Sequence, residues 1–217
     1  MNDPGLNSVL KWAIENSDSS RNDPTAGRDP NAARDPASGL NAEVLAQLMG
    51  GPSDADRMMD AMAAIVSSEV DLENKLIAWD NFEQLIENLD NANNMEKLGL
   101  WMPLVDQLND NEAEVRRMAL WCIGTAVQNN IKCQERLLAI GSTPKIVDLA
   151  VNDSHQPTRK KAVMALSSQI RNYQPGLDEA LKHIPAQFKT TDQVDASDMD
   201  AVDAMVQNLR DHANKTP

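Results

Sequence analysis

Apolar side chains recur every three or four positions from residue 41 to residue 184, which is the spacing of one face of an α-helix. Asn41 and Ser53 each stand where a side-chain cap begins a helix, and a third, longer helix is predicted from Asp71 to Leu89. No run of Val, Ile and Thr alternates with polar residues in the manner of a half-buried strand. The pattern predicts an all-α fold.

The longest predicted helix recurs twice. Its segment from Lys75 to Asn88 aligns without a gap with residues 116–129 and again with residues 159–172, at offsets of 41 and 43 residues. The copies share a basic first residue, a small Ala, an apolar residue four positions later, an aliphatic residue four beyond that and a final Asn. Helical repeats of about 40 to 47 residues are typical of armadillo and HEAT arrays. The predicted fold is a right-handed α-solenoid of about three armadillo-like repeats with helical caps at both ends.

The shared positions also predict how the repeats pack. We expect helix axes to approach closely at the small residue, and the apolar residue four positions later to fill the layer between repeats. The small residues are Ala78, Ala119 and Ala162, and the layer residues are Phe82, Ile123 and Leu166.

Both ends of the chain depart from the repeat. Residues 1–16 contain an amphipathic segment, and residues 17–40 are rich in Asp, Pro, Ala and Ser with almost no large apolar side chains, as is typical of a flexible linker. The repeat register is lost beyond Tyr173, and the predicted repeat domain spans 41–184. Residues 185–217 are predicted to hold a linker and an amphipathic helix that caps the array.

Charge excludes some partners. The chain has 20 Lys and Arg against 33 Asp and Glu, so its formal net charge is −13. Nucleic acid and anionic membranes would be repelled by such a surface. The longest weakly polar stretch, residues 118–127, is far shorter than the ~20 residues that span a bilayer. We expect a cytoplasmic, monomeric protein that binds neither nucleic acid nor membranes.

No constellation for catalysis stands out. The sequence contains no phosphate-binding loop, dinucleotide fingerprint, zinc-protease motif or nucleophile elbow, and its three His residues are scattered. Cys122 and Cys133 lie 11 positions apart, outside any metal-ligand spacing, and are interpreted as buried thiols. We therefore expect no enzyme activity, no metal and no cofactor, and a function in binding.

The segment around Trp121 resembles the groove-lining helix of armadillo repeats. Peptide-binding members carry a Trp, and an Asn four positions later, in repeat after repeat. Here that ladder is broken, which disfavours an adaptor for extended peptides. The Trp positions hold Asp80, Trp121 and Met164, and the Asn positions hold Gln84, Thr125 and Ser168.

Longer runs resemble one family. They are residues 69–76 (EVDLENKL), 80–94 (DNFEQLIENLDNANN), 123–130 (IGTAVQNN), 165–172 (ALSSQIRN) and the opening 10–17 (LKWAIENS). These runs are similar to the fungal nucleotide exchange factors of the cytosolic seventy-kilodalton heat-shock chaperone and to their animal counterpart, the heat-shock-protein-binding protein. Longer members carry a fourth repeat, which this chain is expected to lack after Pro175.

The resemblance implies a clamp. The concave face would grip the ATPase domain of cytosolic heat-shock protein 70, open its nucleotide cleft and promote release of ADP and of the client protein. The alternative is an armadillo-type adaptor for another protein.

Counting by helical turns along the repeat nominates partner-binding residues on the long helices, and the resemblance adds residues 91–94, which match the family's signature. Acidic side chains toward one end and basic side chains toward the other predict a charge gradient that would orient the partner. Trp121 is the strongest candidate anchor, with a structural stacking role as the alternative, and residues 91–94 could instead cap a helix. The nominated residues are Asp80, Glu83, Gln84, Glu87, Asn88, Asn91, Ala92, Asn94, Arg117, Trp121, Thr125, Gln128, Asn129, Lys160, Met164, Ser168 and Arg171.

The N-terminal segment suggests a second action. By resemblance it would imitate a hydrophobic client in the chaperone's substrate groove, and the alternative is a hydrophobic staple folded onto the array. The apolar residues concerned are Leu6, Val9, Leu10, Trp12 and Ile14.

Overall fold

The computed structural model describes residues 51–191 and 193–215. All the helices described below belong to one compact unit, Asp54–Pro217. The predicted N-terminal segment (1–16), the linker (17–40) and the helix capped by Asn41 lie outside the described residues.

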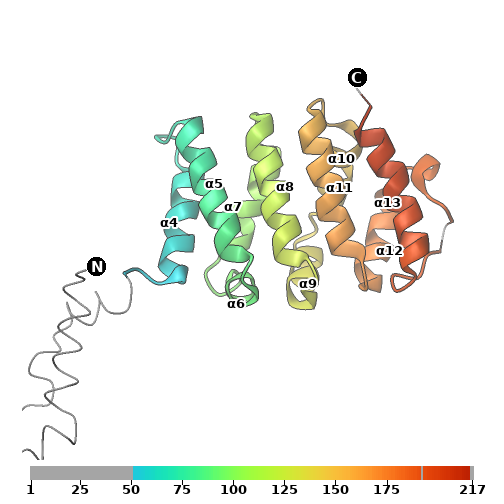
Figure 1. Cartoon of the computed structure of the whole chain (residues 1–217), viewed down its shortest axis with the longest axis horizontal. Helices are drawn as coiled ribbons and strands as arrows, with labels where there is room; N and C mark the ends of the chain where they lie inside the picture. Colours follow the sequence, from blue (N-terminus) through green and yellow to red (C-terminus); the bar gives the residue numbers. More distant parts are fainter. Residues whose placement is uncertain (1–50, 192, 216–217) are drawn as a thin grey trace, which may run out of the picture. The chain divides into compact units, whose positions relative to one another are not determined.

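Four helices of 15 residues each lie side by side and carry the repeat (Figure 1). Each contacts the next one along the chain. The first three coincide with the gapless alignment predicted from the sequence, so the all-α fold with armadillo-like stacking is confirmed. The four are α5 (Leu72–Ile86), α8 (Ala113–Val127), α11 (Gln156–Ile170) and α13 (Met199–Ala213).

Shorter elements connect the long helices and pack against them. In Figure 1, α4, α7 and α10 lie behind the long helices. The elements are α4 (Asp54–Val66) before α5; α6 (Leu89–Asn94), α7 (Trp101–Asp106) and the 3-10 turn η1 (Gln107–Asn109) before α8; α9 (Ile131–Ile140) and α10 (Thr143–Asn152) before α11; and α12 (Gln174–His183) and the 3-10 turn η2 (Ala186–Phe188) before α13.

The spacing of elements continues past Tyr173, contrary to the prediction that the register ends there. α9, α10 and α11 begin at residues 131, 143 and 156, and α12, η2 and α13 begin at 174, 186 and 199, so each starts 43 residues later than its counterpart. The middle element shrinks to one 3-10 turn after Pro185. α13 carries Val202 where α11 has Arg159, so the sequence motif fades while the geometry persists.

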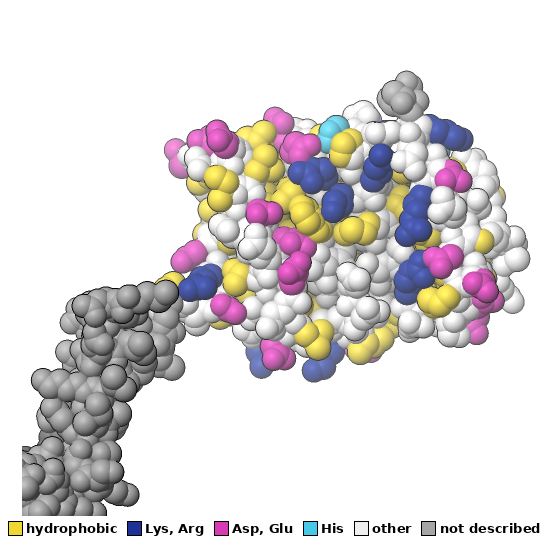
Figure 2. Space-filling view, viewed as in Figure 1, with side chains coloured by type: hydrophobic (Ala, Val, Ile, Leu, Met, Phe, Trp, Pro, Cys, Tyr) yellow, Lys and Arg dark blue, Asp and Glu magenta, His cyan; other side chains and the backbone are white. Residues whose placement is uncertain are grey.

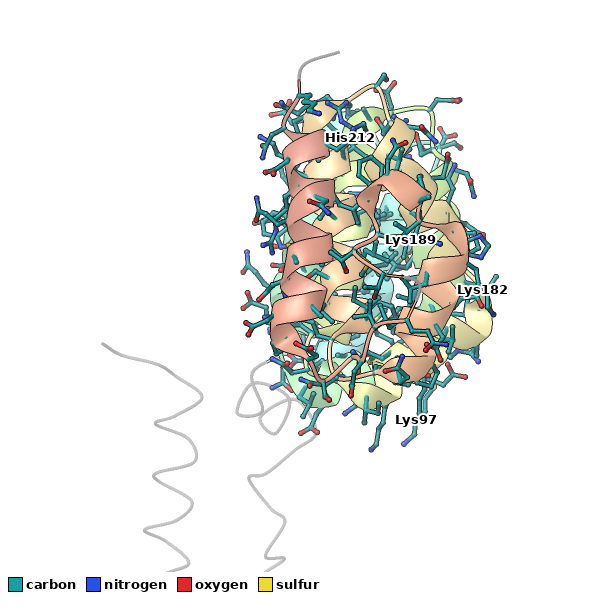
Figure 3. The ribbon with its side chains drawn as sticks, turned by 90° about the vertical axis from the view of Figure 1, so that its right-hand side faces the viewer. Lys97, Lys182, Lys189 and His212 are labelled. Atoms are coloured by element: carbon teal, nitrogen blue, oxygen red, sulfur yellow. The ribbon has the colours of Figure 1, made fainter. Side chains whose placement is uncertain are left out.

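α13 is the last helix in the row formed by α5, α8, α11 and α13, and it covers the C-terminal end of that row. Figure 3 looks onto the end, where α12 and α13 form the outer surface, with Lys182 on α12, Lys189 after η2 and His212 near the end of α13. The side of α13 that meets α11 is apolar and buried. Positions that are buried in α11, such as Ala165 and Ser167, correspond to unburied Asn208 and Arg210 in α13. The exposed outer side is what a terminal repeat needs in water.

The predicted burial of the packing positions is confirmed. All six are buried: Ala78, Ala119, Ala162, Phe82, Ile123 and Leu166. α8 and α11 are in close contact at Gly124, where an added Cβ would lie 2.7 Å from the Met164 methyl carbon and 3.2 Å from the Ala165 Cα. A larger residue there would force the two helices apart.

The basic residue at the head of the repeat ties down the preceding loop. Arg116 Nη1 donates to the carbonyls of Asp110 and Asn111 at 2.8 and 2.9 Å. Arg159 Nη1 donates to the carbonyls of Asp153 and Ser154 at 2.7 and 3.3 Å, which are the same two positions one repeat later. In the second and third copies the arginine therefore satisfies loop carbonyls that would otherwise lack partners.

The repeated Asn closes the long helices. Asn129 and Asn172 adopt left-handed backbone conformations, with φ of 52° and 54°, which Asn tolerates better than most residues. Asn88 instead caps α6 and accepts from the backbone N–H groups of Asp90 and Asn91. α5 therefore ends at Ile86, before the predicted Leu89.

A substitution at Ile123 tests whether this residue fills the layer between repeats. It is fully buried, whereas Ile77 on α5 is 55% exposed. Ile123→Ala is expected to lower the free energy of unfolding by about 2 to 5 kcal/mol because it leaves a cavity between α8 and its neighbours. Ile77→Ala, the matched control, should change it by less than about 0.5 kcal/mol. Urea unfolding measures both, and equal costs would contradict the assigned layer.

Asp153 makes a pH-dependent contribution to the free energy of unfolding. Burial opposes its ionisation, but hydrogen bonds from Arg116 and the His155 N–H together with the Arg116 charge lower the pKa of Asp153 below its ordinary value. In the unfolded chain the carboxyl group has a pKa of about 3.9. The stabilisation is therefore complete above about pH 4 and is lost as the pH falls through the folded-state pKa.

Asp153→Asn is expected to lower the free energy of unfolding by about 2 kcal/mol at neutral pH, since a charge-assisted hydrogen-bond acceptor is lost. The difference from the parent protein should shrink toward about pH 2. Urea unfolding between neutral pH and about pH 2 measures this difference in the free energy of unfolding. Asp106→Asn, at an exposed position, is the control. A pH-independent difference would argue against the assigned linkage.

Candidate functional site

Three long helices bring seven of the nominated residues around one hollow. It has a volume of about 490 Å³ and lies where α5, α8 and α11 meet. We call it the central hollow. Its lining comes from the end of α5, the middle of α8 with the turn that follows it, and α11: Glu83, Glu87, Trp121, Thr125, Gln128, Asn129 and Met164.

A hydrogen bond between two repeats shapes the floor of the central hollow. The Thr125 hydroxyl on α8 donates to Glu83 Oε1 on α5 at 2.7 Å. Glu83 is only 5% exposed, so this bond stabilises a carboxylate that burial would otherwise disfavour. Thr125 stands at the position where peptide-binding armadillo repeats carry Asn, and here it serves a contact within the protein.

Trp121 forms one wall and is itself covered by a charged side chain that the sequence analysis missed. Lys161 Nζ lies 3.8 Å from the centroid of the Trp121 ring, a cation–π contact between α11 and α8. The corresponding residue one repeat earlier, Met118, is buried in the core. Repeat register alone therefore places Lys161 in the interior, and only the packing of α11 against α8 reveals this contact.

The predicted charge gradient is partly cancelled by pairing. Figure 2 shows carboxylates gathered over α5 and Lys and Arg side chains over α8 and α11. Arg117 pairs with Glu114 at 2.7 Å, and Arg171 pairs with Asp203 and donates to Ser167 Oγ at 3.0 Å. Lys160, by contrast, is exposed and has no ion-pair partner within 51–191 and 193–215.

Three other nominated residues lie on the long helices but outside the central hollow. Asp80 and Gln84 are exposed on α5 and bond to each other, with Gln84 Nε2 donating to Asp80 Oδ2 at 3.0 Å. Gln84 lines a different hollow of about 630 Å³, formed by α4 and α5. Ser168 is half-buried on α11, where its backbone carbonyl accepts from Gln134 Nε2 at 2.9 Å.

The nominated residues of α6 belong to the edge of the row. Asn91 Nδ2 donates to the Leu85 carbonyl at 2.9 Å and to Asp54 Oδ2 at 3.0 Å, and Ala92 is buried. Asn91 and Asn94 line a separate pocket of about 800 Å³ between α6 and α9. Together with the cap from Asn88, these bonds give residues 88–94 a structural role in joining α4, α5 and α6.

The thiols are isolated and burial disfavours their reactive form. Burial raises the pKa of Cys133 to about 12 and that of Cys122 well above its ordinary value. Across the described part of the chain, no group of three or more His, Cys, Asp or Glu side chains could hold a metal ion. Nor does any helix there have the length and apolar character needed to cross a membrane.

Two protein-family models match consecutive parts of the chain. The model described as nucleotide exchange factor Fes1 matches residues 6–95. The model described as the SIL1/FES1/HPBP1 C-terminal domain matches residues 91–184. All seven residues that line the central hollow lie within the matched ranges.

Curated fungal proteins are similar over most or all of the chain. The Hsp70 nucleotide exchange factor FES1 of Gibberella zeae is 53% identical over 99% of this chain and 100% of its own length. The protein of the same name from Coccidioides immitis is 48% identical, covering 96% of this chain and 98% of its own. That of Candida glabrata is 43% identical over 77% of this chain, which corresponds to 56% of that longer relative.

Proposed function

The chain belongs to the Fes1 family of Hsp70 nucleotide exchange factors, as the sequence analysis predicted, and from this membership we propose that it binds the ATPase domain of a cytosolic heat-shock protein 70 chaperone. By opening the nucleotide cleft of that domain it promotes the exchange of ADP for ATP and the release of the client protein. The single observation that carries this proposal is the full-length similarity to exchange factors of the same name.

The mechanism needs no chemistry from this chain. An exchange factor must bind the open, nucleotide-poor ATPase domain more tightly than the closed one, and linkage then weakens nucleotide binding by the same factor. Loosening ADP about 1,000-fold requires about 4 kcal/mol of differential affinity. A few well-placed contacts on a rigid surface can supply that amount, because interface energy concentrates in a few residues.

The stacked helices support such a use. The row from α5 to α13 holds its side chains at fixed spacing through buried contacts, so the partner meets a preorganised surface. The central hollow combines the half-exposed Trp121 with polar groups of Gln128 and Asn129, a composition typical of interface hot spots.

An armadillo-type adaptor for a different partner, the alternative from the sequence, is not favoured by relatives that are named exchange factors. The protein is proposed to act without cofactors, in the cytoplasm and as a monomer, on a protein partner rather than on nucleic acid or membranes. The net charge of −13 supports the exclusion of the last two partners.

The N-terminal segment is proposed to imitate a client in the chaperone's substrate groove through Leu6, Val9, Leu10, Trp12 and Ile14, which lie outside the described residues. Deleting residues 1–16 is expected to slow release of a labelled client peptide while leaving ADP release unchanged. Both rates are measured with the chaperone at saturating exchange factor. Unchanged client release together with a lower melting temperature would instead indicate that the segment is a structural staple.

Trp121 is the proposed anchor. Stopped-flow release of fluorescently labelled ADP from the chaperone should accelerate with the parent protein and saturate. Trp121→Ala is expected to require at least about tenfold more protein for half of that acceleration, since buried aromatic side chains dominate hot spots. Helicity, followed by circular dichroism, should be preserved.

Met102→Ala serves as the control for that measurement. It removes an exposed apolar side chain from α7 and should leave the exchange curve unchanged. If Trp121→Ala also exchanges normally, Trp121 is not the anchor. If the parent protein produces no acceleration at saturation, the exchange function itself is refuted.

A further inference from the structure

Lys161 carries a positive charge in a half-buried position without a carboxylate partner. Its ammonium group stacks on Trp121, and no ion pair joins it to an Asp or Glu among the residues that the structure describes. Burial lowers the pKa of Lys161, and the nearby charge of Arg117 lowers it further, while Glu83 acts in the opposite direction. The isolated protein therefore stabilises this cation less well than water would stabilise an exposed lysine.

The start of α11 adds to this imbalance. The first turns of α5, α8 and α13 each contain an acidic residue, Glu73, Glu114 and Asp200, whereas the first turn of α11 contains none. α11 instead has three consecutive cations at residues 159–161, in its second turn.

Among the described residues, only Arg159 of these three cations has hydrogen-bond partners for its side chain. The Arg159 guanidinium is buried and is used by loop carbonyls, as described above, and also donates to the Lys215 carbonyl. Lys160 and Lys161 have no such role. On a chain of net charge −13, they add positive charge to α11, and Lys161 lies on Trp121, which lines the central hollow.

We propose that Lys161 and Trp121 form a recognition site for a single carboxylate, an Asp or Glu side chain on the ATPase domain that the exchange factor binds. This inference rests on the proposed function and specifies the chemistry of one contact in it. An incoming carboxylate would bind the ammonium group while its aliphatic part packs against the indole ring, so it completes the charge balance that the free protein lacks.

The surroundings favour a carboxylate over a more highly charged anion. Glu83 is close enough to act on Lys161, and Glu114 pairs with the neighbouring Arg117. A doubly charged phosphate would be repelled by these two carboxylates more strongly than a singly charged side chain. Because both partners lose water on contact, the pair should affect affinity more than an exposed ion pair does.

The test compares two lysines in the full chain. Lys161→Met keeps an apolar stem over Trp121 but removes the charge, and Lys145→Met makes the same change at a half-buried position on α10, which lies behind the long helices. Lys161→Arg retains the charge and the stacking. For each variant, ADP-release acceleration and equilibrium binding to the isolated chaperone are measured against protein concentration at low and high NaCl, after melting temperatures have been compared.

Lys161→Met is expected to raise the half-saturating concentration by at least about tenfold, to leave the maximal rate unchanged and to weaken the salt dependence. Lys145→Met and Lys161→Arg should each change it by less than about threefold. Equal effects of the two Met variants, or an unchanged salt dependence in Lys161→Met, would overturn the carboxylate site.

The two proposals fail in different ways. If the parent protein binds the chaperone but does not accelerate ADP release, the exchange function fails, and the binding curves still decide the role of Lys161. If the parent accelerates release and the variants do not differ, only the carboxylate site fails. Absence of any binding by the parent protein would refute both.

Discussion

Close packing of one long helix against the next is the constraint on which the rest of the structure depends. No single repeat buries its apolar side, so α5, α8, α11 and α13 become stable only by stacking. At Gly124 the absence of a side chain lets α8 meet Ala165 and the Met164 side chain of α11. The same contact places Met164 at the wall of the central hollow. The packing that stabilises α8 against α11 therefore also shapes the surface of the hollow.

A protein that acts only by binding owes its selectivity to side chains that are already held in position before the partner arrives. Glu83 is held in place by Thr125, and Trp121 is held between the core and Lys161, so neither must be ordered when a partner arrives. Arg117 and Arg171 are already paired, which leaves the lysines of α11 as the cations available to a partner. Rigid stacking thereby turns a small number of side chains into a defined contact surface.

The C-terminal region shows how geometry outlasts sequence motif. The constant 43-residue spacing from α9–α11 to α12–α13 places α13 against α11 as the next long helix, although the contact is smaller than that between α8 and α11. α13 carries Val202 at the position of the basic residue and Lys215 at the position of the Asn, and no further helix follows it in the described chain. Its inner side keeps Val202, Met205 and Leu209, since only burial against α11 is required of it.

The sequence by itself determined the helical class, the three-copy alignment, the buried layer residues and the family, because helical periodicity and long matching runs are local properties. It could also nominate Trp121 and the other residues of the central hollow by counting turns. Only the tertiary structure decided which charges are already paired, that residues 88–94 join helices at the edge, and that Lys161 covers Trp121. Those outcomes depend on distances between different repeats, and such distances arise only when the helices stack.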